Sequence, residues 1–476
     1  MNHLVKPAFV SNGLRSLVLL ALVLPVAAAS GCNCGSSAGG AASDAAADTA
    51  EVDGPSPGDA DAAPVPVSPG GTGAFGVVTT GGKQKLYMPT TMTADGGDAL
   101  LAVVDVGVAG QGVAGAPALL RTIDLGTTNG ATTTGGDATM IVAAAGGSRD
   151  VWFIDPTTDT LVDHVMLDAS FGQAGFSRGG GYVTGIAVDS ARHRAILGVW
   201  NGFALVDLAT HAITSVIQAP PSENFGFDSV HGLLYAPFYD CTFSSNPGAD
   251  ASTPSACGTP MTPGDASTVM TDGLSVVRLS DGAVFTYEDP AASDPTRPVG
   301  AEPDSAGADP TTQLVAVPSE AGDFQNVLDF SKATFDETSH TVTAPHHVLP
   351  GVSYEGVAVD PANHLAFLEA EGSPGIAVLS LPEVSSGGQG WVGGTMPDLP
   401  SGGGGFANLG DPHGIAVTAS ILDGKAVGFL VDSSLHWVAR VDLLAFASAG
   451  QPDASVTADG GQVAAAVTYL DVTTIE

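Results

Sequence analysis

The sequence has few basic residues. It holds only 14 Lys and Arg against 50 Asp and Glu, which gives 476 residues a formal net charge of −36. A chain with this balance is repelled by the phosphates of nucleic acids and by anionic lipid headgroups. We therefore exclude nucleic acid as a partner and also exclude adhesion to a membrane through surface charge.

Long hydrophobic runs are also scarce. The N-terminal run from Leu17 to Ala29 follows Lys6 and Arg15 and leads into small residues. Spanning a bilayer needs about 20 apolar residues, so this run is too short for a transmembrane helix. A basic start, a short apolar run and a small-residue end are typical of a secretory signal, which we place at residues 1–31.

The end of this signal resembles the lipobox of bacterial lipoproteins. Ala29-Ser30-Gly31 stands directly before Cys32, although Ala29 occupies the position where leucine is usual. The resemblance implies cleavage before Cys32, lipidation of its thiol and anchorage in a lipid bilayer. Asn33, in place of an aspartate, implies the outer membrane of a cell envelope. An ordinary secreted protein is the alternative.

The segment 32–73 has little that could form a core. It consists almost wholly of Gly, Ala, Ser, Asp, Pro and Thr, and residues 33–73 contain neither aromatic nor basic side chains. Such a composition cannot bury enough apolar area to offset its conformational entropy. We expect a disordered, acidic linker at 32–73, followed by a folded domain at 74–476.

The remainder of the chain lacks amphipathic helical patterns and predicts an all-β domain. Short runs rich in Val, Ile, Leu and Phe alternate with turn residues, and similar phrases recur. Gly185–Asp189, Gly356–Asp360 and Gly414–Thr418 match one another, and Phe225–Asp228 is a poorer copy. Asp105, Asp155 and Asp207 end comparable third strands. Four short strands per unit predict a β-propeller of seven blades, with six or eight as alternatives.

These phrases resemble the YVTN and NHL repeats of β-propellers. The resemblance rests on Val151–Val162 and on the Gly-x-Ala-Val-Asp phrases, and it extends over most of residues 75–475. It implies a propeller of the superfamily that includes regucalcin-like lactonases, in which binding modules, scaffolds and enzymes all occur. A pair of β-sandwiches is the structural alternative. We also expect the run Val463–Ile475 to close the ring onto the first blade.

Cysteine is rare, with four residues in the chain. Cys241 and Cys257 flank a Ser, Pro, Ala and Gly-rich stretch inside an apparent insertion at 240–272. In an exported protein, two cysteines within one loop predict a disulfide. A zinc site is disfavoured because no histidine lies near them.

Two short motifs match enzyme patterns without their structural context. Gly110–Gly115 fits the G-x-G-x-x-G pattern, and Gly175–Gly179 fits the G-x-S-x-G pattern. Both need a helix immediately after the motif, and neither is followed by a helical pattern. We assign neither a nucleotide site nor a serine nucleophile to them.

The residues at the start of the innermost strands are the candidate site. Thr184, Phe225, Glu355 and His413 precede or begin the repeated phrases, and Glu302 lies close to the equivalent point of its own unit. In the regucalcin-like propellers, acidic and amide side chains of this ring hold a divalent cation. The resemblance implies that Glu302, Glu355 and His413 hold an ion such as Ca²⁺.

Two functions follow from these patterns. The first is a lipid-anchored propeller of the cell envelope that binds a protein or glycan partner without catalysis. The alternative is a metal-dependent hydrolase, similar to lactonases and esterases, or a lyase with a cation at the central channel. The sequence identifies neither a ligand nor a substrate.

Overall fold

The computed structural model divides into two compact units, Met1–Asp61 and Ala62–Glu476. The residues it describes all lie in the second unit. They are residues 73–74, 76–80, 83–94, 96–106, 118–146, 148–168, 171, 183–199, 202–220, 222–238, 272–295, 297–320, 324–350, 354–369, 375–388, 390–395, 412–419, 426–432, 437–449 and 467–471.

The described strands form seven sheets, which we number as blades 1 to 7 in chain order. Blade 1 contains β2 (Gly76–Thr80), β3 (Lys83–Thr93), β4 (Ala99–Asp105) and β5 (Ala118–Asp124). Blade 2 contains β6 (Thr133–Gly136), β7 (Ile141–Ala144), β8 (Asp150–Asp155) and β9 (Thr160–Met166). Blade 3 contains β10 (Val183–Asp189), β11 (Arg194–Val199), β12 (Gly202–Asp207) and β13 (Ile213–Gln218).

Blade 4 carries an extension from its neighbour. Its own strands are β14 (Gly226–Asp228), β15 (Leu233–Phe238), β16 (Gly273–Arg278) and β17 (Ala283–Tyr287). Blade 5 contains β18 (Gly307–Asp309), β19 (Leu314–Pro318), β20 (Phe324–Asp329) and β23 (His346–Pro350). Between β20 and β23, the hairpin of β21 (Thr334–Asp336) and β22 (Thr341–Thr343) reaches across and pairs with β17.

The last two blades follow the same four-strand order. Blade 6 contains β24 (Gly356–Asp360), β25 (Leu365–Glu369), β26 (Gly375–Ser380) and β27 (Trp391–Thr395). Blade 7 contains β28 (Pro412–Ala419), β29 (Ala426–Asp432), β30 (Trp437–Asp442) and β31 (Val467–Asp471). The described helices are short and include α1 (Leu381–Ser385), α2 (Leu443–Ala449), and the 3-10 turns Ser190–Arg192 and Phe330–Lys332.

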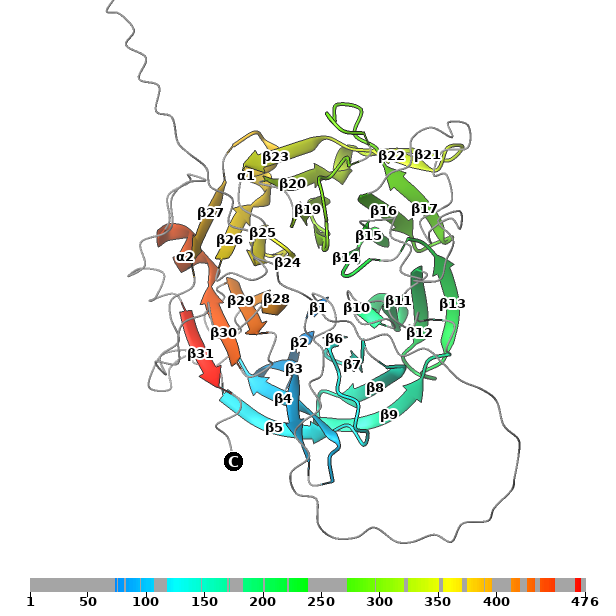
Figure 1. Cartoon of the computed structure of the whole chain (residues 1–476), viewed down its shortest axis with the longest axis vertical. Coiled ribbons are helices and arrows are strands. Elements are labelled where there is room, and N and C mark those ends of the chain that lie inside the picture. The colour runs from blue at the N-terminus through cyan, green and yellow to red at the C-terminus, as the bar shows by residue number, and fades with distance from the viewer. Residues whose placement is uncertain are drawn as a thin grey trace, which may run out of the picture. The chain divides into compact units, whose positions relative to one another are not determined.

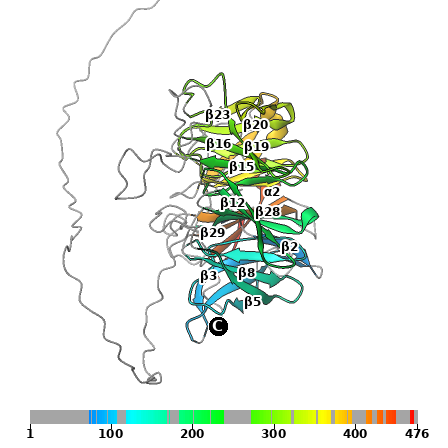
Figure 2. The same ribbon diagram turned by 90° about the vertical axis from the view of Figure 1, so that its right-hand side faces the viewer.

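The sheets are arranged as a ring around a centre, as Figure 1 shows face-on and Figure 2 from the side. The predicted all-β propeller is confirmed, and the seven sheets of the described residues fall within the predicted six to eight. The first strand of each blade lies at the centre and the last at the rim. The phrases predicted to open the units are confirmed as innermost strands: β10, β14, β24 and β28.

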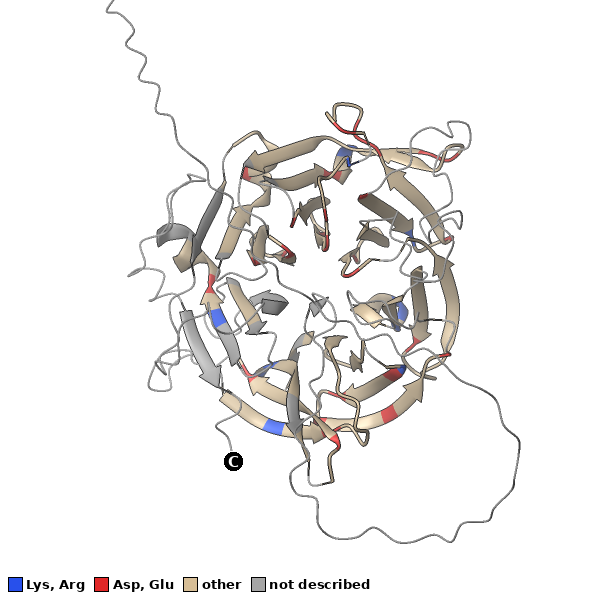
Figure 3. Cartoon of the chain, viewed as in Figure 1, with Lys and Arg blue, Asp and Glu red and all other residues tan. Residues whose placement is uncertain are grey.

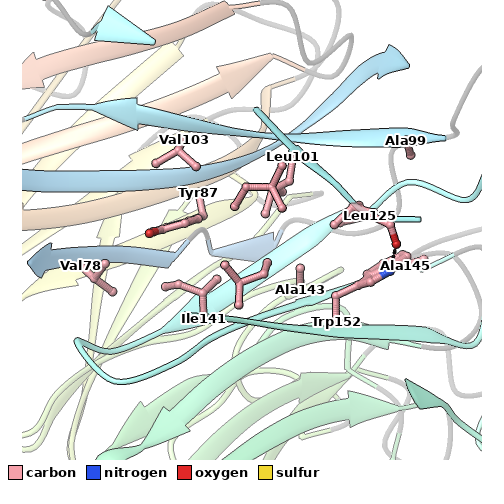
Figure 4. Packing of buried hydrophobic residues seen from close by; sticks show 13 residues of the cluster. Val78, Tyr87, Ala99, Leu101, Val103, Leu125, Ile141, Ala143, Ala145 and Trp152 are labelled. Carbon is pink, nitrogen blue, oxygen red and sulfur yellow. Dashed lines mark hydrogen bonds between the residues drawn. The ribbon is translucent and has the colours of Figure 1, made fainter. Parts of the chain in front are cut away.

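The core lies between adjacent blades. Figure 4 shows one cluster, in which Tyr87 and Leu101 of blade 1 pack against Ile141 and Trp152 of blade 2. Trp152 is fully buried, and its indole Nε1 donates a hydrogen bond to the main-chain oxygen of Leu125 at 3.1 Å. Because blades cover both faces of the middle strands, β7, β15 and β19 are buried along their whole length. Their near-continuous apolar runs follow from this two-sided burial.

The rim strands and turns are polar for the corresponding reason. β13 exposes all but one of its residues, and its sequence mixes apolar with polar side chains. The preceding third strand ends in Asp207, whose carboxylate accepts hydrogen bonds from the main-chain N–H groups of Ala209 and Thr210. Asp155 caps the equivalent turn of blade 2 through Thr157 N–H at 2.7 Å. Asp105, Asp155 and Asp207 therefore occupy the equivalent third-strand positions that the sequence predicts.

Blades 1 and 2 are also joined by a buried ion pair. Lys85 on β3 donates from Nζ to both carboxylate oxygens of Asp159 at 2.8 Å and to the main-chain oxygen of Pro156 at 3.0 Å. The hydroxyl of Tyr87 donates to Asp159 Oδ1 at 2.5 Å. Lys85 and Asp159 are 6% and 8% exposed, so water screens this pair little.

The predicted closure of the ring by the C-terminal run is wrong. Within that run, β31 pairs with β30 and completes the rim of blade 7 itself. The N-terminal strand β1 (Gly73–Ala74) makes the connection instead, because it pairs in parallel with the innermost strand β28 and is followed in the chain by β2 of blade 1. A continuous four-strand blade 7 leaves no rim position for a strand from elsewhere.

Several predictions concern residues outside the described part. The signal at 1–31, the lipidation at Cys32, most of the linker at 32–73 and the disulfide between Cys241 and Cys257 all fall there, as does most of the insertion at 240–272. They stay predictions. In the part of the chain that the structure describes, no helix has the length and apolar character needed to cross a membrane.

Candidate functional site: the central channel and its acidic mouth

The innermost strands enclose a channel of about 270 Å³. Its walls are mostly glycine, alanine and branched aliphatic positions of β2, β6, β10, β14, β18 and β24, together with Phe225 and Phe227. Among the described lining residues, only Thr134 and Asn224 carry polar side chains. The channel itself therefore offers an apolar wall and main-chain polar groups.

Glycine is required where neighbouring innermost strands approach each other. A Cβ atom added to Gly135 of β6 would lie 2.7 Å from the main-chain oxygen of Ile186 on β10. At Gly226 of β14, it would lie 3.0 Å from the main-chain oxygen of Ala306, beside β18. The glycines of the repeated phrases thus set the width of the ring at its centre.

A ring of equivalent positions lies where the innermost strands begin. Asp189, Asp228, Asp309 and Asp360 end β10, β14, β18 and β24 and pair with the start of the following strand in the same way. Counting five residues back from each of these aspartates gives the equivalent positions, which are Thr184, Glu223, Asp304 and Glu355. Counting back from Thr418 on β28 gives His413.

Two members of the predicted ring are therefore corrected. The position in blade 4 is held by Glu223 and not by Phe225, and the position in blade 5 is held by Asp304 and not by Glu302. β14 and β18 have only three residues each, so the start of the hydrogen-bonded strand is displaced from the ring position. The aspartate that ends each innermost strand is the signal that would have located both residues.

Glu223, Asp304 and Glu355 are buried at one end of the channel, with exposed fractions of 9%, 2% and 3%. With Glu320 they form what we call the acidic mouth. Figure 3 shows acidic positions at the inner ends of blades 4, 5 and 6. Asn224 follows Glu223, and Ala306 lies two positions after Asp304; both line the channel, so the mouth adjoins the channel wall.

Hydrogen bonds to main-chain oxygens fix the segments that carry these carboxyl groups. Thr184 Oγ1 donates to the oxygen of Ser222 at 2.7 Å, and the N–H of Asn224 donates to the oxygen of Asp304 at 3.2 Å. Ser305 Oγ donates to the oxygen of Glu355. Blades 3 to 6 are linked in sequence at the mouth, which holds their ring residues against one another.

The pKa of Asp304 is strongly perturbed by its surroundings in the mouth. Burial raises the pKa of Asp304 well above its usual range, and the charge of Glu223, a hydrogen bond with Glu320 and the charge of Glu355 raise this pKa further. Asp304 therefore keeps its proton where an ordinary aspartate has lost it and donates a hydrogen bond to Glu320. Its other oxygen, Oδ1, is buried without a hydrogen-bond partner among the described residues.

Of the three metal ligands predicted from the sequence, the described residues place only Glu355 in the acidic mouth. Glu355 lies in the acidic mouth, whereas Glu302 lies two residues before Asp304, is only partly buried and has a left-handed backbone with φ 49°. The side chain of His413 is outside the described residues. In the described part, no group of three His, Cys, Asp or Glu side chains is placed so that it could hold a metal ion.

The N-terminal strand lies at the same mouth. β1 pairs Gly73 with Gly414 and Ala74 with Ile415, close to where β28 begins, and it also lies near β6, β10 and β24. Figure 1 accordingly shows β1 near the centre of the ring. Because the pairing is parallel, β1 runs in the same direction as β28, from the face on which the innermost strands begin. The residues of the acidic mouth that precede innermost strands, Glu223, Asp304 and Glu355, lie toward that face.

We expect Asp304→Asn to stabilise the protein in a pH-dependent manner. Below the ordinary aspartate pKa of about 3.9, the carboxyl group is protonated in both the folded and unfolded states. As the pH rises from there to the raised pKa of the fold, the unfolded chain loses its proton first, and the free energy of unfolding falls. Asparagine keeps a hydrogen-bond donor for Glu320 and cannot ionise.

Urea unfolding at pH 4 and pH 8 measures this effect. At pH 8, the free energy of unfolding of Asp304→Asn should exceed that of the parent protein, because asparagine carries no cost of ionisation. At pH 4 the difference should shrink toward zero. Glu383→Gln on α1, which neutralises an exposed carboxylate, is the control and should show no such difference. An equal difference at both pH values would contradict the assignment.

The ring of blades around a central channel defines the protein as a β-propeller. Similar solved structures include hydrazine synthase from Kuenenia stuttgartiensis, with a TM-score of 0.46 and 11% sequence identity, covering 79% of this chain and 95% of that one. Hsv2 from Kluyvelomyces marxianus matches with a TM-score of 0.42 and 7% identity, covering 76% and 87% of the two chains. No protein-family model and no curated protein matches the chain.

Proposed function

We propose that this protein is an exported, lipid-anchored β-propeller of the YVTN and NHL type, which binds a protein or glycan partner at the cell envelope. The sequence supports export and anchorage through the signal at 1–31 and the lipobox-like Cys32. In the outer membrane, the acidic linker at 32–73 would separate the lipid from the propeller. The large negative charge of the chain would keep the domain away from anionic headgroups.

The position of β1 carries this proposal. The segment joins the propeller at its centre, beside the innermost strand of blade 7, and not at the rim. A tether attached there leaves the rim strands and the opposite face of the ring open to a partner. The carboxyl groups of the mouth add a recognition element close to the point of attachment.

Anchorage is tested by metabolic labelling with a clickable fatty-acid analogue. We expect the parent protein to be labelled and to sediment with membranes, because the lipid is attached to Cys32. The variant Cys32→Ala should lose both properties, whereas Cys34→Ala, two residues away, should retain them. Labelling that persists in Cys32→Ala, or that is absent from the parent protein, would refute the anchor.

Partner binding is tested on isolated cell envelopes. The purified full-length Cys32→Ala protein, which cannot insert a lipid, is titrated onto envelopes, and we expect saturable binding. Pretreatment of the envelopes with protease should abolish binding to a protein partner, and pretreatment with glycosidases should abolish binding to a glycan. Binding that rises linearly without saturation would contradict a specific partner.

A metal-dependent hydrolase or lyase is the second candidate. The observation that favours it is the convergence of Glu355 with Asp304 and Glu223 at the channel mouth. Metal analysis of the purified protein separates the two functions. A stoichiometric divalent ion that is lost in Glu355→Gln and His413→Ala variants would favour the enzyme, and a metal-free, fully stable protein would exclude it.

A further inference from the structure

We propose that the acidic mouth binds an organic cation, an ammonium or guanidinium group carried on an apolar stem. This inference rests on the proposed binding function and names the chemistry of the group that the propeller recognises. The same group could be supplied by a free amine or by a lysine or arginine side chain of a protein partner, and the experiment separates these sources.

The first step of the argument is charge. Glu223, Asp304, Glu320 and Glu355 converge from blades 4, 5 and 6, and three of them are at least nine-tenths buried. Buried like charges repel strongly because little water screens them. A cation at this place would relieve the repulsion, whereas an anion or a neutral group would not.

The second step is the unpartnered oxygen of Asp304. A buried acceptor without a donor has lost its hydrogen bonds to water, and a bound N–H group would replace them. Oδ1 of Asp304 is such an acceptor. The side chain of Asp304 faces the other acids, because it hydrogen-bonds Glu320 and its pKa is raised by the charge of Glu223. An ammonium or guanidinium group carries a positive charge and N–H donors that Oδ1 of Asp304 can accept.

The third step is the adjoining channel. Its apolar walls include Phe225, Phe227, Val357 and Val359, and its volume of about 270 Å³ accommodates a short alkyl chain. A bare metal ion would gain nothing from these walls. In the described part, the mouth also provides no group of three ligands placed to hold a metal ion. An apolar stem with a cationic head fits the mouth and the channel together.

The probe is hexylammonium, titrated calorimetrically into the purified full-length protein at pH 7.5, with hexanol as the uncharged match. We expect hexylammonium to bind at least about tenfold more tightly than hexanol, because charge-assisted hydrogen bonds form only with the amine. A five-residue peptide with one central lysine and both ends capped is the second arm. Binding of the peptide indicates a side chain of a partner, and binding of hexylammonium alone indicates a free amine.

Variants test whether the mouth is the place of binding. Asp304→Asn and Glu223→Gln should each weaken hexylammonium binding about tenfold, and the exposed Glu383→Gln should leave it unchanged. Because a cation favours the ionised form of Asp304, binding to the parent protein should release protons. This release is measured in two buffers of different ionisation enthalpy, and it requires no variant to fold.

Three results would overturn the inference. They are equal affinity for hexylammonium and hexanol, unchanged affinity in both mouth variants, and stoichiometric binding of Ca²⁺ that hexylammonium does not displace. Each of these leaves saturable binding to envelopes intact, so the inference can fail while the proposed function stands. Conversely, if binding to envelopes were absent while binding of the amine was retained, the proposed function would be refuted and the cation site would still be supported.

Discussion

Replacing Lys85 with methionine is expected to lower the free energy of unfolding by about 3 to 5 kcal/mol. Methionine fills most of the space of the lysine stem but leaves the carboxylate of Asp159 buried between blades 1 and 2 without its cation. Among the described residues, Tyr87 alone would then hydrogen-bond that carboxylate. Urea unfolding at pH 7, followed by tryptophan fluorescence, measures the loss.

Two further variants distinguish the buried charge from simple loss of packing. Adding Asp159→Asn to Lys85→Met removes the uncompensated charge, and asparagine tolerates the left-handed backbone at this position, where φ is 54°. The double variant should recover most of the stability. Lys83→Met is the matched control, because the Lys83 side chain is half exposed and its Nζ lies 3.5 Å from Oδ2 of Asp105. This variant should lower the free energy of unfolding by about 0 to 1 kcal/mol. Similar losses for both lysines would contradict a special role for the buried pair.

The repeated phrases made the fold accessible from sequence. Gly-x-Ala-Val-Asp marks an innermost strand because its glycine permits close approach of backbones and its aspartate caps the next turn. Asp228, for example, accepts hydrogen bonds from the N–H groups of Val230 and His231. Both functions are local, so they are visible in single sequences. A run of apolar residues at the second and third strands then follows from coverage by blades on both faces.

The way the ring closes could not be predicted in the same way. Two short extended segments lie near the ends of the propeller domain, Val467–Asp471 and Gly73–Ala74. By its sequence, either segment is able to pair with a free sheet edge where the ring closes. The choice depends on whether blade 7 already has four strands of its own. That is a property of the whole ring and not of either segment.

The candidate site was found in part for a related reason. Glu355 stands directly before a complete Gly-Val-Ala-Val-Asp phrase, so its place in the ring was readable. Asp304 and Glu223 precede the degenerate phrases of blades 5 and 4, whose innermost strands are short. Their role emerges only when the blades are superposed by their strand-ending aspartates. Glu320 lies two residues after the second strand of blade 5, and no local pattern links it to the ring.

Glycine sets the width of the channel at its centre. Replacing a glycine there is the second change for which we expect a large loss of stability. We expect Gly135→Val to lower the free energy of unfolding by about 3 kcal/mol, the upper end of the usual cost of overpacking. A side chain at this position would collide with the main-chain oxygen and the Cγ2 atom of Ile186, each 2.7 Å from the added Cβ. Main-chain atoms of a central strand cannot move aside without displacing blade 3.

The control for this variant is Ser215→Val on the exposed rim strand β13, which adds the same branched side chain where space is open. It should change the free energy of unfolding by about 0.5 kcal/mol or less. Comparison of the two variants by urea unfolding separates the clash at the centre from any general effect of valine in a strand. If Gly135→Val were as stable as Ser215→Val, the innermost strands would have room to move apart. Glycine would then not set the width of the channel, and the apolar stem of a bound cation would not be confined by it.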